Sequence, residues 1–350
     1  MNDEKLTVDN RKNYDMIDIF KLVSAVLVVF IHANDTPNIH IDLIVKSFSR
    51  FAVPFFFVVS GFFFKKGLDR ANSKRDYFFK YQKKLILIYI FWALVNIPLQ
   101  LNTYLNLYSE ASTIKILLLM CRRIFLCGSG FVWYILAMIE AAAVIYLLDK
   151  YKKKRLLISL IIIGLILGVI YDSFFEVLSG TPVGRINDIF YTVFSWSNNF
   201  IMKGIPFMGL GYLFAIKIPK IKLSISWLLF CTASILNIVL CCLEYLQISE
   251  IFTQIQWYYI LSNVQTVCFF LIAVKTQISI PSGICRTSRE LSSAIYFLHP
   301  YMIYQIIEVI FGHSFNIDLK IVLAILASVV IYIIVKKLNI KPLKYVLNIK

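Results

Sequence analysis

The residues best suited to chemistry lie together in the first long apolar segment, YDMIDIFKLVSAVLVVFIHAN. Lys21 and His32 are eleven positions apart, which at about 100° per helical residue places them within about 20° of the same face. Asp18 lies one turn before Lys21 and can neutralise it as an i, i+3 partner. One helix would then present a carboxylate, a cation and an imidazole in a row. In a plainer alternative, Lys21 reaches the nearer membrane interface beside Asp18, and His32 lies at the other interface.

Arg50 is a second charged residue at an apolar segment, RFAVPFFFVVSGFFFKK. Pro54 follows Arg50 by four residues and lacks an N–H, so the carbonyl of Arg50 loses its helical donor and a kink beside a buried cation is expected. Ser60 and Gly61 come near the end of the same segment. Such small residues allow either close helix packing or the approach of a ligand to the backbone.

Two further ionisable residues fall within apolar segments. Glu140 follows Trp133 and Tyr134 by one to two helical turns, and His299 directly precedes Pro300. Since a charged group inside a membrane costs about 2.5 to 3.5 kcal/mol on insertion scales, such residues are expected to face protein or a wet cavity. The alternative for Glu140 is a structural ion pair.

The composition predicts what must hold these residues in place. The chain of 350 residues is 59% hydrophobic and 16% charged, against about 45 to 50% and about 25% in soluble domains, which excludes an ordinary soluble protein. Apolar segments near the length of about 20 residues that spans a bilayer recur along the chain. We therefore expect an all-α, polytopic integral membrane helix bundle of about ten transmembrane helices. The expected spans are 16–34, 45–64, 82–101, 131–149, 156–171, 200–217, 224–246, 256–274, 292–311 and 319–336.

The net charge of +16 is best explained by topology. Twenty-seven lysines and arginines lie in the termini and alternate connections, but only four lie in the intervening ones. Because basic short loops stay cytoplasmic, both termini are predicted inside, with tails 1–15 and 337–350. Attraction to the lipid bilayer accounts for the charge without a nucleic acid partner.

One integral membrane domain, 1–350, in the cell membrane is the simplest organisation. The segments 114–127 and 186–196 are apolar but short, and fit re-entrant or interfacial pieces better than spans. The seven cysteines are scattered, without the spacing of a disulfide framework or a metal site. We therefore expect no bound metal.

The motifs together resemble the acyltransferase 3 family of membrane proteins. The resemblance runs from about Tyr14 to the last span. It is carried by Lys21 and His32, by Arg50-x-x-Val53-Pro54-x-Phe56-Phe57-x-x-Ser60-Gly61, by Trp133-Tyr134, and by Ile295-Tyr296-x-x-His299-Pro300.

The resemblance implies an O-acyltransferase that moves an acyl group, in the first instance acetyl, from cytoplasmic acyl-CoA to a hydroxyl of an envelope glycan or another acceptor. Acyl-CoA would be a co-substrate, with no permanently bound cofactor. His32 would be the general base, and Arg50 would hold donor or oxyanion charge. Lys21 with Asp18 would contact the donor. Ser60, Tyr134, Glu140 and His299 would line the channel.

Two other functions remain open at this stage. Within the family, the segments YDSFF, NNFIMKGIPFMGLG and SSAIYFLHPYMI look most like the membrane half of the VanT-type serine racemases of glycopeptide resistance. That resemblance implies a serine-uptake component working with a racemase on a separate soluble chain. A purely structural scaffold would instead tolerate replacement of Lys21, His32 and Arg50.

Overall fold

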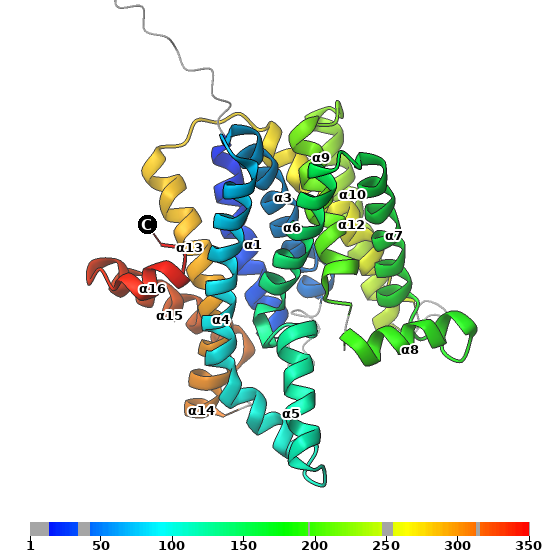
Figure 1. Cartoon of the computed structure of the whole chain (residues 1–350), viewed down its shortest axis with the longest axis vertical. Helices are drawn as coiled ribbons and strands as arrows, with labels where there is room; N and C mark the ends of the chain where they lie inside the picture. The colour runs from blue at the N-terminus through cyan, green and yellow to red at the C-terminus, as the bar shows by residue number, and fades with distance from the viewer. Residues whose placement is uncertain (1–13, 34–42, 195–196, 247–254, 313–315, 350) are drawn as a thin grey trace, which may run out of the picture.

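The described part of the chain is helical throughout. The computed structural model describes residues 14–33, 43–194, 197–246, 255–312 and 316–349, and no strand occurs among them. In chain order (Figure 1), the helices are α1 (Asp15–Ala33), the π-helical η1 (Val45–Ser49), α3 (Ala52–Arg70), α4 (Lys74–Leu107), α5 (Thr113–Arg122), the π-helical η2 (Arg123–Cys127), the short 3₁₀ helix η3 (Gly130–Val132), α6 (Trp133–Lys150), α7 (Lys154–Ser173), α8 (Pro182–Phe194), the π-helical η4 (Phe200–Met208), α9 (Gly209–Ile216), α10 (Leu223–Tyr245), α12 (Trp257–Lys275), α13 (Ser282–Tyr301), the π-helical η5 (Met302–Ile307), α14 (Glu308–Phe311), α15 (Ile317–Lys337) and α16 (Lys341–Val346).

The predicted fold class, a polytopic membrane helix bundle, is confirmed. Within the described residues, seven helices are long and apolar enough to cross a membrane. Helices also occupy most of the other three expected spans, 16–34, 200–217 and 292–311, of which residue 34 lies outside the described residues. These three are not among the seven, so the count of ten stays a prediction. The seven are Val45–Arg70, Lys74–Leu107, Thr113–Lys150, Lys154–Ser173, Leu223–Tyr245, Trp257–Lys275 and Ile317–Lys337.

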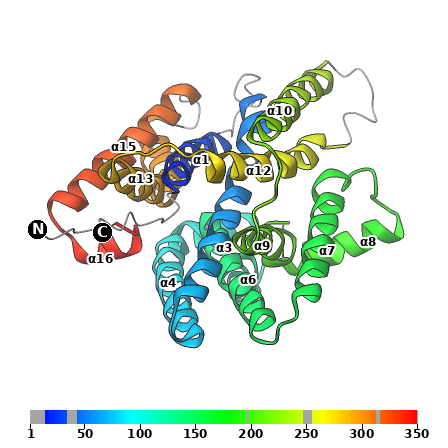
Figure 2. The ribbon, with the colours of Figure 1, turned by 90° about the horizontal axis from the view of Figure 1, so that it is seen from above.

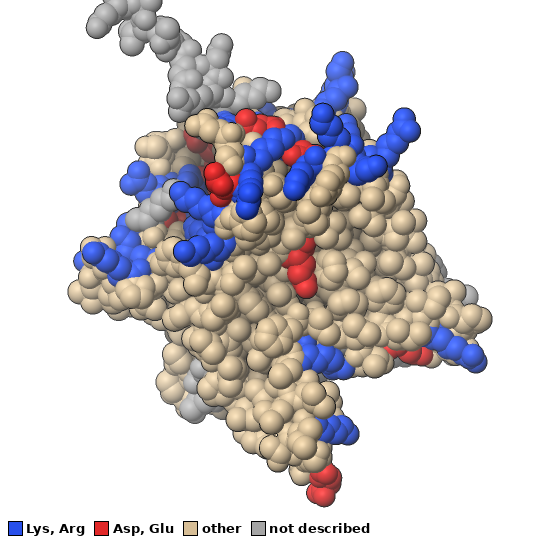
Figure 3. Space-filling view, in the orientation of Figure 1, with Lys and Arg blue, Asp and Glu red and all other residues tan. Residues whose placement is uncertain are grey.

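Basic side chains gather at one end of the bundle. Figure 3 shows Lys and Arg crowded over the upper end of the molecule and sparse elsewhere on this face. This basic end holds the end of α3, the start of α4 and the connection from α6 to α7, where Lys74 donates to Asp149 at 2.9 Å. The charge asymmetry counted along the sequence thus corresponds to an asymmetry in space. That this end faces the cytoplasm stays a prediction.

The two short apolar segments form separate short helices. The segment 114–127 forms α5 and η2, and 186–196 falls largely on α8, with residues 195–196 outside the described residues. In Figure 1, α8 runs across the direction of α7, as an interfacial helix would.

The segment expected to be a C-terminal tail, 337–350, is folded against the bundle. It contains α16, and Leu347 and Ile349 just beyond that helix are buried. The indole of Trp92 on α4 donates to the carbonyl of Val346 at 3.2 Å. This segment therefore forms part of the wall beside α4.

Seen from above, the helices form two groups joined through a central pair. Figure 2 shows α1, α10, α12, α13 and α15 on one side and α4, α6, α7 and α8 on the other, with α3 and α9 between them. The closest pairings join α1 with α13, α10 with α12, and α3 with α9. The α1–α13 pair carries two of the four sequence motifs, α3 carries most of the third, and α6 carries Trp133-Tyr134.

Glycine allows the central pair to cross closely. A methyl group added at Gly61 of α3 would collide with the carbonyl oxygen of Met208, and one added at Gly211 of α9 would collide with the carbonyl oxygen of Val58. Both obstacles are backbone atoms, which cannot turn aside as the end of a long side chain can. Of the two explanations for Ser60-Gly61, close helix packing therefore accounts for Gly61.

We expect Gly211→Ala to lower the thermal unfolding midpoint of the detergent-purified protein markedly, because overpacking costs about 1 to 3 kcal/mol or more. Gly283→Ala is the matched control, since a methyl group there meets no atom within 4 Å. Equal midpoints for the two variants would show that the crossing is not tight.

Candidate functional site

A cavity of about 320 Å³ opens among α1, α3, α4, α6 and α13. Lys21 of α1 and Lys84 of α4 line it. By the rise of about 1.5 Å per residue, these lysines lie about 9 Å and about 15 Å along their helices from the basic end. The rest of the wall is mostly apolar or aromatic. Lys84 also donates to Asn348 at 2.5 Å, so the folded C-terminal segment closes one side of the cavity.

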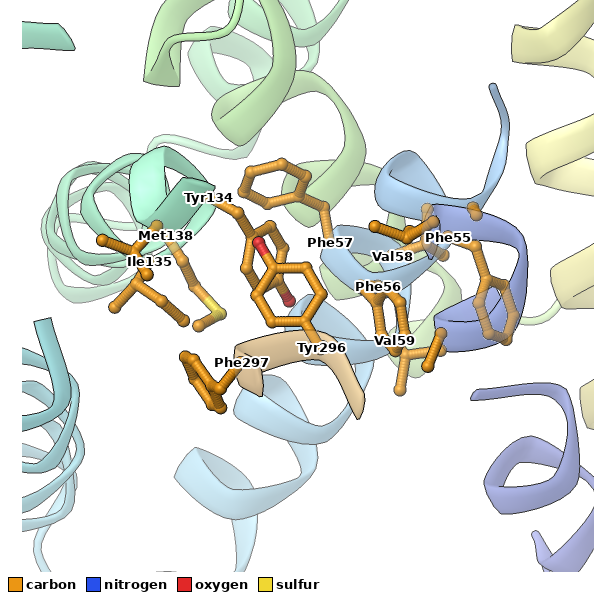
Figure 4. Packing of buried hydrophobic residues seen from close by; sticks show 14 of the residues in the cluster. Phe55, Phe56, Phe57, Val58, Val59, Tyr134, Ile135, Met138, Tyr296 and Phe297 are labelled. Carbon is orange, nitrogen blue, oxygen red and sulfur yellow. The ribbon is translucent and has the colours of Figure 1, made fainter. Parts of the chain in front are cut away.

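Hydroxyl groups mark the deep end of this cavity. The hydroxyl groups of Ser60 and Tyr134 lie 3.0 Å apart in a hydrogen bond. The rings of Tyr134 and Tyr296 pack edge to face with centroids 5.6 Å apart, and Phe56 contacts both rings (Figure 4). Both tyrosines are more than nine-tenths buried. Apolar walls thus lead to a small cluster of hydroxyls.

Two imidazoles lie beyond the tyrosine pair. The ring centroids of His32 and His299 are 5.2 Å apart, and the ring of Phe131 packs edge-on against His32 at 4.9 Å. Tyr296 connects this region to the cavity: its hydroxyl donates to the carbonyl of Phe131 at 3.3 Å, and its ring lies 6.3 Å from that of His299. The histidine pair is therefore one aromatic layer away from the cavity.

A hydrogen bond to a backbone carbonyl fixes the tautomer of His299. Its Nδ1 lies 2.9 Å from the carbonyl oxygen of Ile295. A carbonyl only accepts, so Nδ1 donates, and Nε2 of the neutral ring is left as an acceptor. That Nε2 atom is buried and has no hydrogen-bond partner in the described part of the chain. His299 thus offers a proton-accepting nitrogen next to His32.

Arg50 lies over two adjacent aromatic rings. Its guanidinium carbon is 5.5 Å from the ring centroid of Tyr258 and 5.4 Å from that of Tyr259. Its charge is close enough to act electrostatically on His32. Cation–π contact with two rings stabilises a guanidinium that is partly withdrawn from water. The Arg50 cation is therefore held where it can act on charge near the histidines.

Helix irregularities accompany the prolines of the motifs. The π-helical η1 ends one residue before Arg50, and a turn at Arg50 and Phe51 leads into α3, which contains Pro54. The π-helical η5 likewise begins two residues after Pro300. Because proline removes a helical donor and crowds the preceding turn, the helix widens nearby. The kink expected at Arg50 is thus realised as a π-helical segment followed by a turn.

An ion pair fixes α1 to α13 near the basic end. Arg289 donates to both carboxylate oxygens of Asp18, from Nε at 3.1 Å and from Nη2 at 2.7 Å. Hydrogen bonding to Asp18 raises the pKa of Arg289. The expected pairing of Asp18 with Lys21 is present but looser, at 3.7 Å. The carboxylate is therefore shared between two cations and mainly joins the two helices.

The structure brings most of the sequence-predicted site residues together, but not Glu140. Lys21, Ser60 and Tyr134 line the cavity, while Glu140 is absent from its wall and has no ion pair within the described residues. Tyr134 and Met138 of α6 face the cavity. Glu140 is two residues beyond Met138, so it points to the other side of the same helix.

Several residues of the site were not anticipated. Arg289, Ser292 and Tyr296 precede His299 at helical spacing, and Ser292 and Tyr296 line the cavity. That i, i+3, i+7, i+10 spacing was a readable signal of one polar face on α13. Lys84 carried no comparable signal, because it is one of eight lysines and arginines between Lys65 and Lys84 in the sequence.

Comparison with known proteins gives one family and a few distant relatives. The pattern of a family described as an acyltransferase domain matches residues 14–336. An amino-acid racemase of Enterococcus faecalis is 27% identical over 224 residues, covering 61% of this chain and 30% of the relative. A serine/alanine racemase of Enterococcus gallinarum is 26% identical over 295 residues, covering 82% and 40%. The chain thus spans less than half the length of these curated relatives. No solved structure matches the chain.

We expect Asp18→Asn to lower the thermal unfolding midpoint, because the change leaves Arg289 and Lys21 without their carboxylate. The Arg289 side chain is 44% exposed, but the Asp18 carboxylate that the change removes is only 12% exposed and accepts hydrogen bonds from Arg289. Losing a hydrogen-bonded charge at such a position costs about 1 to 3 kcal/mol. Lys74→Gln is the control, since it breaks an ion pair whose lysine side chain is 50% exposed, and such pairs contribute at most about 1 kcal/mol. Equal losses in the two variants would contradict a special role for the α1–α13 ion pair.

Proposed function

We propose that this chain, which belongs to the acyltransferase 3 family, is a multi-pass membrane acyltransferase for groups other than amino-acyl groups. In this proposal it moves an acyl group from cytoplasmic acyl-CoA to a hydroxyl group of an acceptor on the opposite side. An acetyl group and an envelope glycan are the donor group and acceptor that we propose first. The observation that most supports this function is the cavity lined by lysines, which leads to hydroxyls and then to a histidine pair.

Donor binding fits the chemistry of the cavity wall. Lys21 and Lys84 supply positive charge suited to the phosphates of coenzyme A. The apolar and aromatic walls suit the slender pantetheine arm, while the nucleotide would remain nearer the basic end. The thioester would then lie near the hydroxyl groups of Ser60 and Tyr134.

The acyl transfer step uses the histidine pair. His32 accepts the proton of the acceptor hydroxyl as its oxygen attacks the thioester carbonyl carbon. The new carbon–oxygen bond forms, the carbon–sulfur bond breaks, and the proton passes to the leaving thiolate. His299 offers its unprotonated Nε2 to the imidazolium that forms on His32. The charge of Arg50 stabilises the oxyanion that develops at the carbonyl.

Serine uptake is a second candidate, because the E. gallinarum relative that covers 82% of this chain is named a serine/alanine racemase. In that case the same cavity would conduct serine to a racemase on a separate soluble chain. Uptake of labelled L-serine into proteoliposomes distinguishes the two functions. Uptake that persists in wild-type protein without acyl-CoA would favour serine transport.

We expect Lys84→Gln to weaken the binding of acetyl-CoA to the purified protein about tenfold, because one charge-assisted hydrogen bond to a phosphate is lost. Calorimetry in detergent provides the measurement. Lys83→Gln is the matched control, since Lys83 is the exposed neighbour on α4 and does not line the cavity. Equal affinities for wild type and Lys84→Gln would exclude Lys84 from donor binding.

We expect His32→Gln to lower the acylation of envelope glycan by about 100-fold or more, the usual contribution of a positioned general base. Acetyl-CoA binding should stay within about twofold of wild type, which separates catalysis from donor binding. His313→Gln serves as the control, because His313 falls between the expected spans 292–311 and 319–336 and is predicted to lie in an outer loop, outside the described residues. Product at the wild-type level, with equal protein in the membrane, would remove His32 from catalysis.

A further inference from the structure

A second cavity, on the other side of the bundle, lies outside the proposed acyl transfer site. It also measures about 320 Å³ and is bounded by α7, η4, α9, α10 and α12. Leu165, Phe207, Leu229 and Val267 are among its walls, and nearly all of its lining is apolar. Leu229 on α10 is 42% exposed, so the cavity is open on its outer side. We call it the α7–α10 groove.

Close packing elsewhere leaves this groove unfilled. Gly164 and Gly168 bring α7 against the backbone of η4, near the carbonyls of Ile201 and Met202. On the other side, α10 packs along α12. In Figure 2, α7 and α10 lie apart from each other, and the residues that line the groove come from these helices and from η4, α9 and α12. In a membrane protein, such an apolar opening is in contact with lipid acyl chains.

Lysines surround one end of the groove. Ile221, in the connection between α9 and α10, lines the groove, and Lys220 and Lys222 flank it in sequence. Lys275, at the end of α12, donates to the carbonyls of Pro219 and Ile221. Lys220 and Lys222 are exposed, and neither pairs with a carboxylate within the described residues. The basic end of the groove therefore carries positive charge that no described acidic group neutralises.

The opposite end of the groove has no comparable unneutralised positive charge among the described residues. Leu165, Phe207 and Asn263 also border a smaller pocket that reaches Lys203 and Asp172. Lys203 donates to Asp172 at 2.5 Å, so its charge is neutralised. An anionic group joined to an apolar chain would accordingly bind with its charge at the basic end.

From this arrangement we propose that the α7–α10 groove is a binding site for one anionic phospholipid from the leaflet at the basic end. An acyl chain fills the groove along Leu229 and Val267, and the phosphate contacts Lys220 and Lys222. The bound lipid joins the α7–η4 side of the bundle to the α10–α12 side. It stabilises the folded protein by mass action, since it binds the packed helices and not the separated ones. The site is independent of the proposed reaction.

The experiment measures lipid binding to the full chain purified in detergent. Phosphatidylglycerol and phosphatidylcholine with identical acyl chains are the probes, and native mass spectrometry and the thermal unfolding midpoint are the measurements. For wild type, we expect one phosphatidylglycerol to bind about tenfold more tightly than phosphatidylcholine and to raise the midpoint more. Inorganic phosphate alone should do neither. Equal binding of the two lipids, or the same rise with phosphate, would overturn the proposal.

Two pairs of variants test the groove and its charge separately. Leu229→Trp should weaken binding of both lipids about tenfold, while Leu236→Trp, at a position on the same helix that is 45% exposed but outside the groove, should not.

The charge at the basic end of the groove is tested by a second pair of variants. Lys220→Gln with Lys222→Gln should remove the preference for phosphatidylglycerol and retain phosphatidylcholine binding. Lys153→Gln with Lys154→Gln, also exposed at the basic end, should change neither. If either groove or lysine variant changed lipid affinity no more than its control does, the lipid would be attracted diffusely to the protein and would not bind at this site. A dimer that Leu229→Trp abolishes would show that a second copy occupies the groove.

Discussion

The structure depends on one constraint: a polar side chain inside an apolar bundle must find its partner on a neighbouring helix. The α1–α13 pair meets that constraint at both of its ends. Near the basic end, Asp18 is held by Arg289, and at the far end His32 packs beside His299. The ion pair sets how α1 and α13 lie against each other, and that alignment brings the two imidazoles together. Helix packing and the proposed chemistry are therefore consequences of the same pairings.

The sequence predicted those features that are local to one helix. The period of about 3.6 residues was enough to place Lys21 and His32 on one face of their helix, and charge counting was enough to predict a basic end. It could not reveal which helix lies beside which. Arg289 falls between the expected spans 256–274 and 292–311, and nothing in the sequence indicated that it binds Asp18. The contact of Arg50 with two tyrosine rings could not be predicted for the same reason, since more than 200 residues separate Arg50 from Tyr258 and Tyr259.

Glu140 shows where the sequence argument was incomplete. The cost of burying a carboxylate predicts that it avoids lipid, but does not specify what it faces. The cavity wall on α6 is defined by Tyr134, Ile135 and Met138. A one-helix argument could have compared Glu140 with Tyr134, which lies six residues earlier and therefore about 120° away around the helix.

The rings of Tyr134 and Tyr296 form a layer between the cavity and the histidine pair, and a reaction that joins the two faces of a membrane needs such a barrier. An open channel from the cavity to the histidines would let water and ions through, and water would compete with the acceptor hydroxyl for the thioester. Here Tyr134 is held by Ser60, and Tyr296 by the carbonyl of Phe131, so the rings close the path while leaving hydroxyl groups at the boundary. In the proposed function, the acyl group would cross this single aromatic layer by a turn of the two rings, and the much larger coenzyme A would stay on the cavity side. The same two rings would therefore both seal the bundle and determine which part of the donor reaches His32.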